Sequence, residues 1–297
     1  MNGRKETAGE GSRLSLTGFM AAIIAVCAVS LFPAPSIAGP AGEVRQITAA
    51  PQRPTTFAVS GDGHVAWLEA GSGAPMMRAP GGEVSPIALP ARARAVAGDE
   101  KGQILVLAGE AQTGYKVYFH RDGRRIRTVD LKPAAPIDSP VDMASGNEIV
   151  WVLQAKPPLA ALFGSDGAEL GRQDLAGVAA APFSIAVDHA GRAFVTDPTA
   201  QAVIELTPYG QFKKVHALTG SGFTRPAGIA ASFSDRLWLS DTVTGEVAPF
   251  RETPSGLVRD ETRQAIKVDD PVKLSVTAGE LWLLQGWRGG ISRVRIE

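Results

Sequence analysis

The chain has 297 residues, 44% of them hydrophobic, and its 30 basic residues balance 30 acidic ones. This composition supports a sizeable core and excludes a disordered or collagen-like chain, while the balanced charge argues against a general nucleic-acid or membrane-surface binder. A single cysteine excludes an intrachain disulfide and a cysteine-based metal cluster.

The first 38 residues have the layout of a secretory signal peptide. Basic residues precede an apolar, uncharged run over 14–32, and prolines and small residues then lead up to Ala38. This order predicts export and cleavage after Ala38, and therefore a periplasmic or secreted protein with one domain over residues 39–297. The alternative is an uncleaved membrane anchor, because the apolar run is about long enough to cross a bilayer.

A repeat of about 43 residues organises the rest of the chain. Three features recur with the same period: a proline before an apolar segment, a short apolar segment that ends in a polar residue, and a turn glycine before a polar segment. The prolines are Pro54, Pro140, Pro182, Pro226 and Pro271, and a sixth repeat starts within 91–98. The glycines are Gly82, Gly123, Gly167, Gly210 and Gly256.

Each repeat is predicted to form four short strands, because apolar and polar residues alternate between Gly, Asp and Asn turns. The repeat that begins at Pro182 is the clearest, with expected strands at 183–188, 192–197, 202–207 and 211–218. Four-stranded antiparallel units with this period are typical of propeller blades. We therefore predict an all-β, six-bladed propeller.

The two ends of the chain predict how the ring closes. The last repeat contains only three strands, at 272–277, 280–285 and 291–297. The segment 43–48 follows the turn glycine Gly42, and residues 41–47 are similar to residues 81–87 at the end of the first repeat. Pairing of 43–48 with the last blade would close the ring and remove an exposed sheet edge.

The repeats that begin at Pro182 and Pro226 resemble NHL repeats, and they are similar to blades of the gluconolactonase (regucalcin-like) six-bladed propellers. Judged by the repeat period, the resemblance extends over residues 41–297. It implies the propeller fold more specifically than any activity, because propellers serve many functions. In lactonases of this type, a divalent cation lies in the central channel, held by Glu, Asn and Asp at the starts of the innermost strands.

This chain departs from that ligand pattern. The two positions after each repeat proline are occupied by Thr55 and Thr56, Val141 and Asp142, Phe183 and Ser184, Ala227 and Gly228, and Val272 and Lys273. Asp142 is the only carboxylate among them, and a hard cation needs several converging oxygen ligands. We therefore expect no metal and no cofactor, and we keep a metal-dependent hydrolase or lactonase as the alternative function.

The histidines and the common catalytic motifs do not favour an enzyme. His64 and His189 are expected in turns between first and second strands, His120 at the end of a third strand and His216 in an outer strand. A general base must reach its substrate, whereas these four residues are dispersed around the ring, and we expect surface histidines. The sequence contains no nucleophile elbow, P-loop or His-Glu-x-x-His motif.

Two repeated columns are expected to serve the fold. The aromatic column should pack between blades; its members are Trp151, Phe194, Trp238 and Trp282. The polar column should hydrogen-bond to backbone within its own blade, or else form a polar ring at the channel mouth; its members are Glu69, Gln154, Asp197, Asp241 and Gln285.

Candidate binding residues gather on the top face, which carries the starts of the first strands and the ends of the second strands. They are Arg53, Arg92, Asp142, Arg225, Asp270, Lys273, Trp287 and Arg288. An exposed Trp beside an Arg is typical of an interaction hot spot, although the Trp could instead fold over the blade edge. We predict an exported, non-catalytic binding or scaffold propeller whose top face engages a protein or a small ligand, without nucleic acid and without a membrane span after cleavage.

Overall fold

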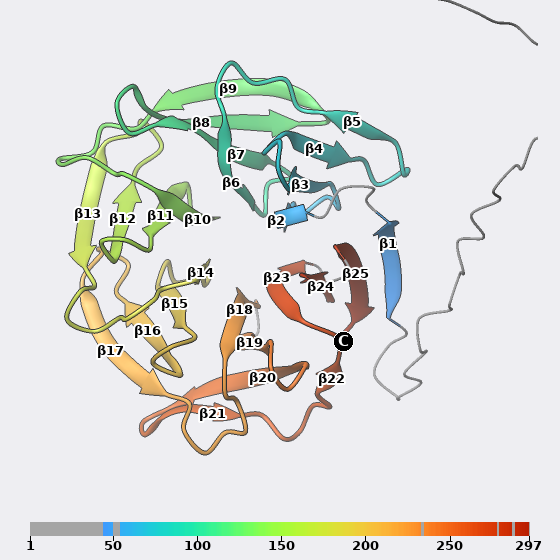
Figure 1. The fold of residues 1–297 in the computed structure, drawn as a ribbon, viewed down its shortest axis with the longest axis vertical. Helices are drawn as coiled ribbons and strands as arrows, with labels where there is room; N and C mark the ends of the chain where they lie inside the picture. The colour runs from blue at the N-terminus through green and yellow to red at the C-terminus, as the bar shows by residue number, and fades with distance from the viewer. Residues whose placement is uncertain (1–43, 50–53, 233–234, 278, 287–288, 297) are drawn as a thin grey trace, which may run out of the picture. The chain divides into compact units, whose positions relative to one another are not determined.

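Short β-strands make up the regular structure of the protein in the computed structural model, which describes residues 44–49, 54–232, 235–277, 279–286 and 289–296. The strands form six antiparallel sheets around a central channel (Figure 1). Across these residues no helix is long and apolar enough to cross a membrane. The predicted six-bladed, all-β propeller is confirmed, while the predicted signal segment over 1–38 lies outside the described residues.

The first five blades each run in chain order from an inner strand to outer strands, and the repeat period sets their limits. Blade 1 contains β2 (Pro54–Val59), β3 (Val65–Glu69), β4 (Pro75–Arg78) and β5 (Val84–Pro86). Blade 2 contains β6 (Ala93–Gly98), β7 (Ile104–Glu110), β8 (Gly114–Arg121) and β9 (Arg124–Asp130). Blade 3 contains β10 (Pro140–Gly146), β11 (Ile149–Gln154), β12 (Leu159–Phe163) and β13 (Glu169–Asp174).

The second half of the ring repeats this plan with one addition. Blade 4 contains β14 (Ser184–Val187), β15 (Ala193–Asp197), β16 (Ala202–Leu206) and β17 (Phe212–Ala217). Blade 5 contains β18 (Pro226–Ala231), β19 (Arg236–Asp241), β20 (Glu246–Thr253), β21 (Gly256–Arg259) and the short β22 (Ile266–Lys267). The sequence pattern did not predict β22, which pairs with the start of β20 because β20 is long enough to hold two partners.

The N-terminal strand closes the ring as predicted. Blade 6 contains β23 (Pro271–Thr277), β24 (Glu280–Gln285), β25 (Gly290–Arg295) and, as its outer strand, β1 (Arg45–Ala49). β1 runs antiparallel to β25, with Arg45 opposite Arg293 and Ala49 opposite Gly290. The inner strands β23 and β2 lie against each other, so the last blade meets the first. The observed strand is shifted by one or two residues from the predicted 43–48.

The aromatic column packs between neighbouring blades, as predicted. Trp151 is fully buried and lies in one cluster with Ile185 and Val195 of the next blade. Trp282 of the last blade lies in one cluster with Phe57 of the first. Each of these aromatic side chains packs between two blades. Their burial therefore stabilises the closed propeller without disulfides.

The inner strands set the character of the channel. Each inner strand is an edge strand of its sheet, so its outer backbone edge faces the channel without a partner strand. In five blades the inner strand begins with a bulge just after the proline or, in blade 2, after Ala93. A bulge re-aims the following side chain. The start of the inner strand is therefore where side chains can enter the channel.

Candidate functional site

A ring of six residues, one from each blade, lies two positions after the start of each repeat. Its members, in blade order, are Thr56, Ala95, Asp142, Ser184, Gly228 and Lys273. Asp142 belongs to blade 3 and Lys273 to blade 6, so the two residues approach the channel from opposite sides of the ring (Figure 1). The repeat therefore places two opposite charges at the same level of the channel.

Asp142 and Lys273 form a buried ion pair across the channel. Lys273 Nζ donates to Asp142 Oδ2, and it also donates to Ser184 Oγ at 3.2 Å. Ser184 Oγ in turn donates to Asp142 Oδ2 at 3.0 Å, and the backbone N–H of Ile185 donates to the same oxygen at 2.8 Å. All three side chains are buried. This cluster crosses the channel where the innermost strands begin.

The donors around Asp142 do not fit the divalent cation implied by the lactonase resemblance. Oδ2 already accepts three hydrogen bonds, and Oδ1 accepts one from the backbone N–H of Met143. Lys273 also supplies the positive charge that a cation would bring to this ring. A metal would need further carboxylates here, and the other ring positions carry none. We therefore derive no chemistry through a metal in the channel.

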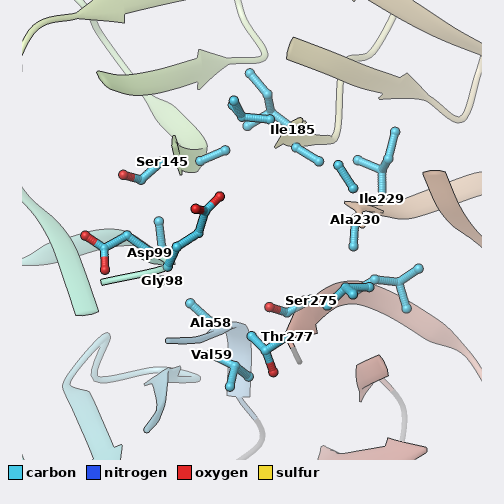
Figure 2. A pocket seen from close by; sticks show the side chains of 18 of the residues that line it. Ala58, Val59, Gly98, Asp99, Ser145, Ile185, Ile229, Ala230, Ser275 and Thr277 are labelled. Atoms are coloured by element: carbon cyan, nitrogen blue, oxygen red, sulfur yellow. The ribbon is translucent and has the colours of Figure 1, made fainter. Parts of the chain in front are cut away.

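A cavity of about 300 Å³ occupies the channel between the Asp142–Lys273 cluster and the ends of the innermost strands. Figure 2 shows Ala58, Asp99, Ser145, Ile185 and Ser275 around its open centre. Lys273 lines its inner end, and its rim consists of residues at the ends of the innermost strands. These rim residues are Gly61, Asp99, Glu100, Asp188, His189 and Thr277. The cavity thus opens on the face opposite the predicted top face.

The rim of the cavity is polar and its wall is mostly small or apolar. Burial raises the pKa of Asp99 above its ordinary value, although hydrogen bonds from the Gln103 and Lys101 backbone oppose the shift. Asp188 is paired with Arg192, at 2.7 Å between Oδ2 and Nε. A turn that recurs in the sequence could have indicated this rim. In four blades, the backbone N–H of the residue after the inner strand donates to the carbonyl oxygen four residues later; these residues are Ser60, Asp99, Asp188 and Ser232.

The other predicted binding residues are spread over the top face. Arg92 and Arg225 are exposed there and Asp270 is half-buried. Asp142 and Lys273 meet inside the channel, so these two are brought together and the others are not. The remaining candidates, Arg53, Trp287 and Arg288, lie outside the described residues.

Four of the five members of the polar column bind backbone groups as predicted, whereas Glu69 accepts from the Ser72 hydroxyl. The carboxylate of Asp241 accepts from the backbone N–H groups of Thr224, Arg225, Val243 and Thr244. These hydrogen bonds lower the pKa of Asp241 against the opposing effect of burial. Asp197 binds four backbone N–H groups in the same way, and Gln154 binds the backbone of Asp138 and Pro157. The column ties loops to strand ends.

The prediction of surface histidines is wrong for three of the four. His64, His120 and His216 are buried, and only His189 is exposed. The repeat period placed these residues in the correct turns and strands, but it did not show that they are buried. His216 Nε2 lies 2.9 Å from Oε2 of the buried Glu205. Both ring nitrogens of His120 are buried without a hydrogen-bond partner.

The buried His120 ring predicts a loss of stability in acid. Burial lowers the pKa of His120, and the nearby Arg125 charge lowers it further. The unfolded chain therefore takes up a proton near the ordinary histidine pKa of about 6.5, while the folded chain does so only at lower pH. Urea unfolding between pH 7 and pH 5 should show a falling free energy of unfolding, with a shallower fall in His120→Phe. Parallel pH profiles for the two proteins would contradict this assignment.

The fold is similar to those of several solved enzymes. A streptogramin B lyase is 13% identical, with a TM-score of 0.62 over 86% of this chain and 97% of that one. A gluconolactonase from Xanthomonas campestris is 12% identical, with a TM-score of 0.64 over 86% and 90%. A catalytically inactive virginiamycin B lyase from Staphylococcus aureus, solved with quinupristin, is 16% identical, with a TM-score of 0.61 over 84% of each chain.

At these identities the likeness concerns the fold. No family model matches the sequence, and no curated protein matches it. The resemblance to gluconolactonase-type propellers is thus supported at the level of structure, whereas the finer assignment to NHL repeats is not. The chain is built like propellers among which lactonases and lyases occur.

Proposed function

We propose that this chain is an enzyme that acts on a small organic molecule in the channel cavity, in the hydrolase or lyase class. The cavity closed at its inner end by Lys273 carries the proposal. Its volume of about 300 Å³ lies at the low end for small-molecule sites. Lactonases and lyases among the proteins of similar fold favour this function over a purely non-catalytic scaffold. We also propose that the segment 1–38 exports the protein.

Lys273 is the residue best placed to act on a bound molecule. An ammonium group has three N–H donors, and two of them are directed to Asp142 and Ser184. The third donor is left for an oxygen atom of a ligand at the inner end of the cavity. A positive charge fixed in a buried site stabilises negative charge that develops on a carbonyl oxygen. The chemistry therefore suits esters, lactones or other carbonyl compounds, with Asp142 and Ser184 as positioning residues.

The first test blocks the cavity without touching the ion pair. Ser275 lines the cavity and is half-buried, so Ser275→Trp should fill the space that a substrate needs. We expect the parent protein to hydrolyse members of a panel of p-nitrophenyl esters and simple lactones, with EDTA present, and Ser275→Trp to lower kcat/KM at least tenfold. The readouts are p-nitrophenol release and acid release in a pH-stat.

The matched control introduces the same tryptophan side chain outside the channel. Ser165 lies exposed in the β12–β13 turn, so Ser165→Trp should keep the parent activity. The proposal fails if the panel gives no turnover, or if Ser275→Trp is as active as Ser165→Trp.

A second candidate function is partner binding on the top face. Val141, Phe183 and Val243 are exposed large hydrophobic residues at or near the starts of inner strands and after the second strand of blade 5. The exposed Arg225 lies before the inner strand of blade 5. Exposed apolar side chains beside an arginine are typical of interaction surfaces. Absence of turnover together with capture of a protein partner would favour this function.

A further inference from the structure

Two clusters of one histidine and two carboxylates occur in the described part of the chain, and they differ in their surroundings. One contains Glu205, His216 and Glu252, and the other contains Asp62, His64 and Asp122. Arg192 and Lys213 form ion pairs with both carboxylates of the first cluster. That cluster is already neutralised, and a cation there would meet two positive charges.

The second cluster lacks such compensation. Among the described residues no lysine or arginine forms an ion pair with Asp62 or Asp122. Among the charged groups of the described residues, the Asp62 carboxylate is paired only with the ring of His64.

The three side chains come from two blades. Asp62 and His64 lie in and just after the β2–β3 turn of blade 1, and Asp122 lies in the β8–β9 turn of blade 2. One ligand atom of each lies within 4.8 Å of the others. Ser60 Oγ donates to Asp62 Oδ1 at 2.5 Å and fixes the carboxylate. A side chain at Gly102 would come within 2.9 Å of Asp62 Oδ2, so the glycine leaves room for this carboxylate between the blades.

The His64 ring provides an independent sign of a ligand. The residue is 8% exposed, and its Nδ1 is buried without a hydrogen-bond partner. Nδ1 nevertheless lies 3.0 Å from Asp62 Oδ1, without the alignment that a hydrogen bond requires. A buried polar atom normally has a partner. Two potential ligand atoms at this separation suit a shared cation.

We propose that Asp62, His64 and Asp122 bind one divalent transition-metal ion, of which Zn²⁺ is the best fit. Imidazole favours Zn²⁺ and its neighbours over Ca²⁺ and Mg²⁺, which prefer oxygen ligands alone. Three protein ligands leave a further position for water or a fourth donor. The ion would join blade 1 to blade 2 beside the rim of the cavity, where Gly61 and Asp99 lie. This site is separate from the Asp142–Lys273 cluster and does not depend on the proposed function.

Isothermal titration of the tag-free, EDTA-treated protein with ZnCl₂ tests the site. We expect one Zn²⁺ per chain and a rise in Tm of roughly 5 °C at a hundredfold excess over the Kd. Asp122→Asn should weaken binding at least tenfold. Asp122 has a φ of +49°, a conformation that asparagine also adopts readily, so this variant should fold as the parent does.

Asp166→Asn is the matched control, because Asp166 lies exposed in the equivalent turn of blade 3. It should bind Zn²⁺ like the parent, and CaCl₂ should bind to neither protein with comparable affinity. The proposal is overturned if the parent binds no Zn²⁺, or if Asp122→Asn binds it as tightly as Asp166→Asn does.

Discussion

Removal of residues 39–49 is expected to destabilise the whole propeller and not only its last blade. The deletion takes away β1 and leaves the edge of β25 without a partner. It also removes Val44 and Ile47, which pack against two different hydrophobic clusters of blades 5, 6 and 1. Partial burial of two aliphatic side chains and the lost strand pairing together contribute on the order of 3–6 kcal/mol. Because every blade depends on its neighbours, an open ring should lose cooperativity.

Differential scanning calorimetry of chains that begin at residue 39 and at residue 50 measures this effect. We expect the shorter chain to melt at least about 6 °C lower, or not to fold, given about 2–4 °C per kcal/mol for a domain of this size. A synthetic peptide of residues 41–49, added in excess, should restore part of the loss by pairing with β25. Equal melting temperatures for the two chains would show that β1 does not close the ring.

Much of this architecture was predictable because propeller blades repeat. The spacing of prolines such as Pro182 and Pro226 predicts the blades, and the three-stranded last repeat predicts the closing strand. The aromatic column predicts burial, since an aromatic ring such as that of Trp151 recurs at the same place in four of the six blades. The sequence period predicts these features because equivalent residues in different blades have equivalent neighbours.

Features that depend on non-equivalent residues in different blades could not be predicted in the same way. Asp142 and Lys273 were both expected at the channel, but their direct pairing depends on the side-chain reach across it, which no repeat pattern contains. The cavity results from six backbone edges that face one space, and only the closed ring defines its depth.

The second large effect is expected from Lys273→Met. Loss of the ammonium leaves the carboxylate of Asp142 buried with only the Ser184 hydroxyl and backbone N–H groups as partners. Breaking a buried ion pair on one side typically costs about 3–5 kcal/mol. Urea unfolding of Lys273→Met should show a decrease of this size in the free energy of unfolding.

The double variant Asp142→Leu, Lys273→Met separates the charge effect from the packing. It removes both buried charges and keeps apolar volume in the ring, so it should recover most of the stability that Lys273→Met loses. Lys116→Met, which breaks the exposed pair with Asp130, should leave stability nearly unchanged. If Lys273→Met unfolds like the parent, the ion pair is not formed in the folded protein. If the double variant is stable but no longer turns over esters, the Asp142–Lys273 pair is needed for the reaction and not only for the fold, because the propeller persists while the pair is gone.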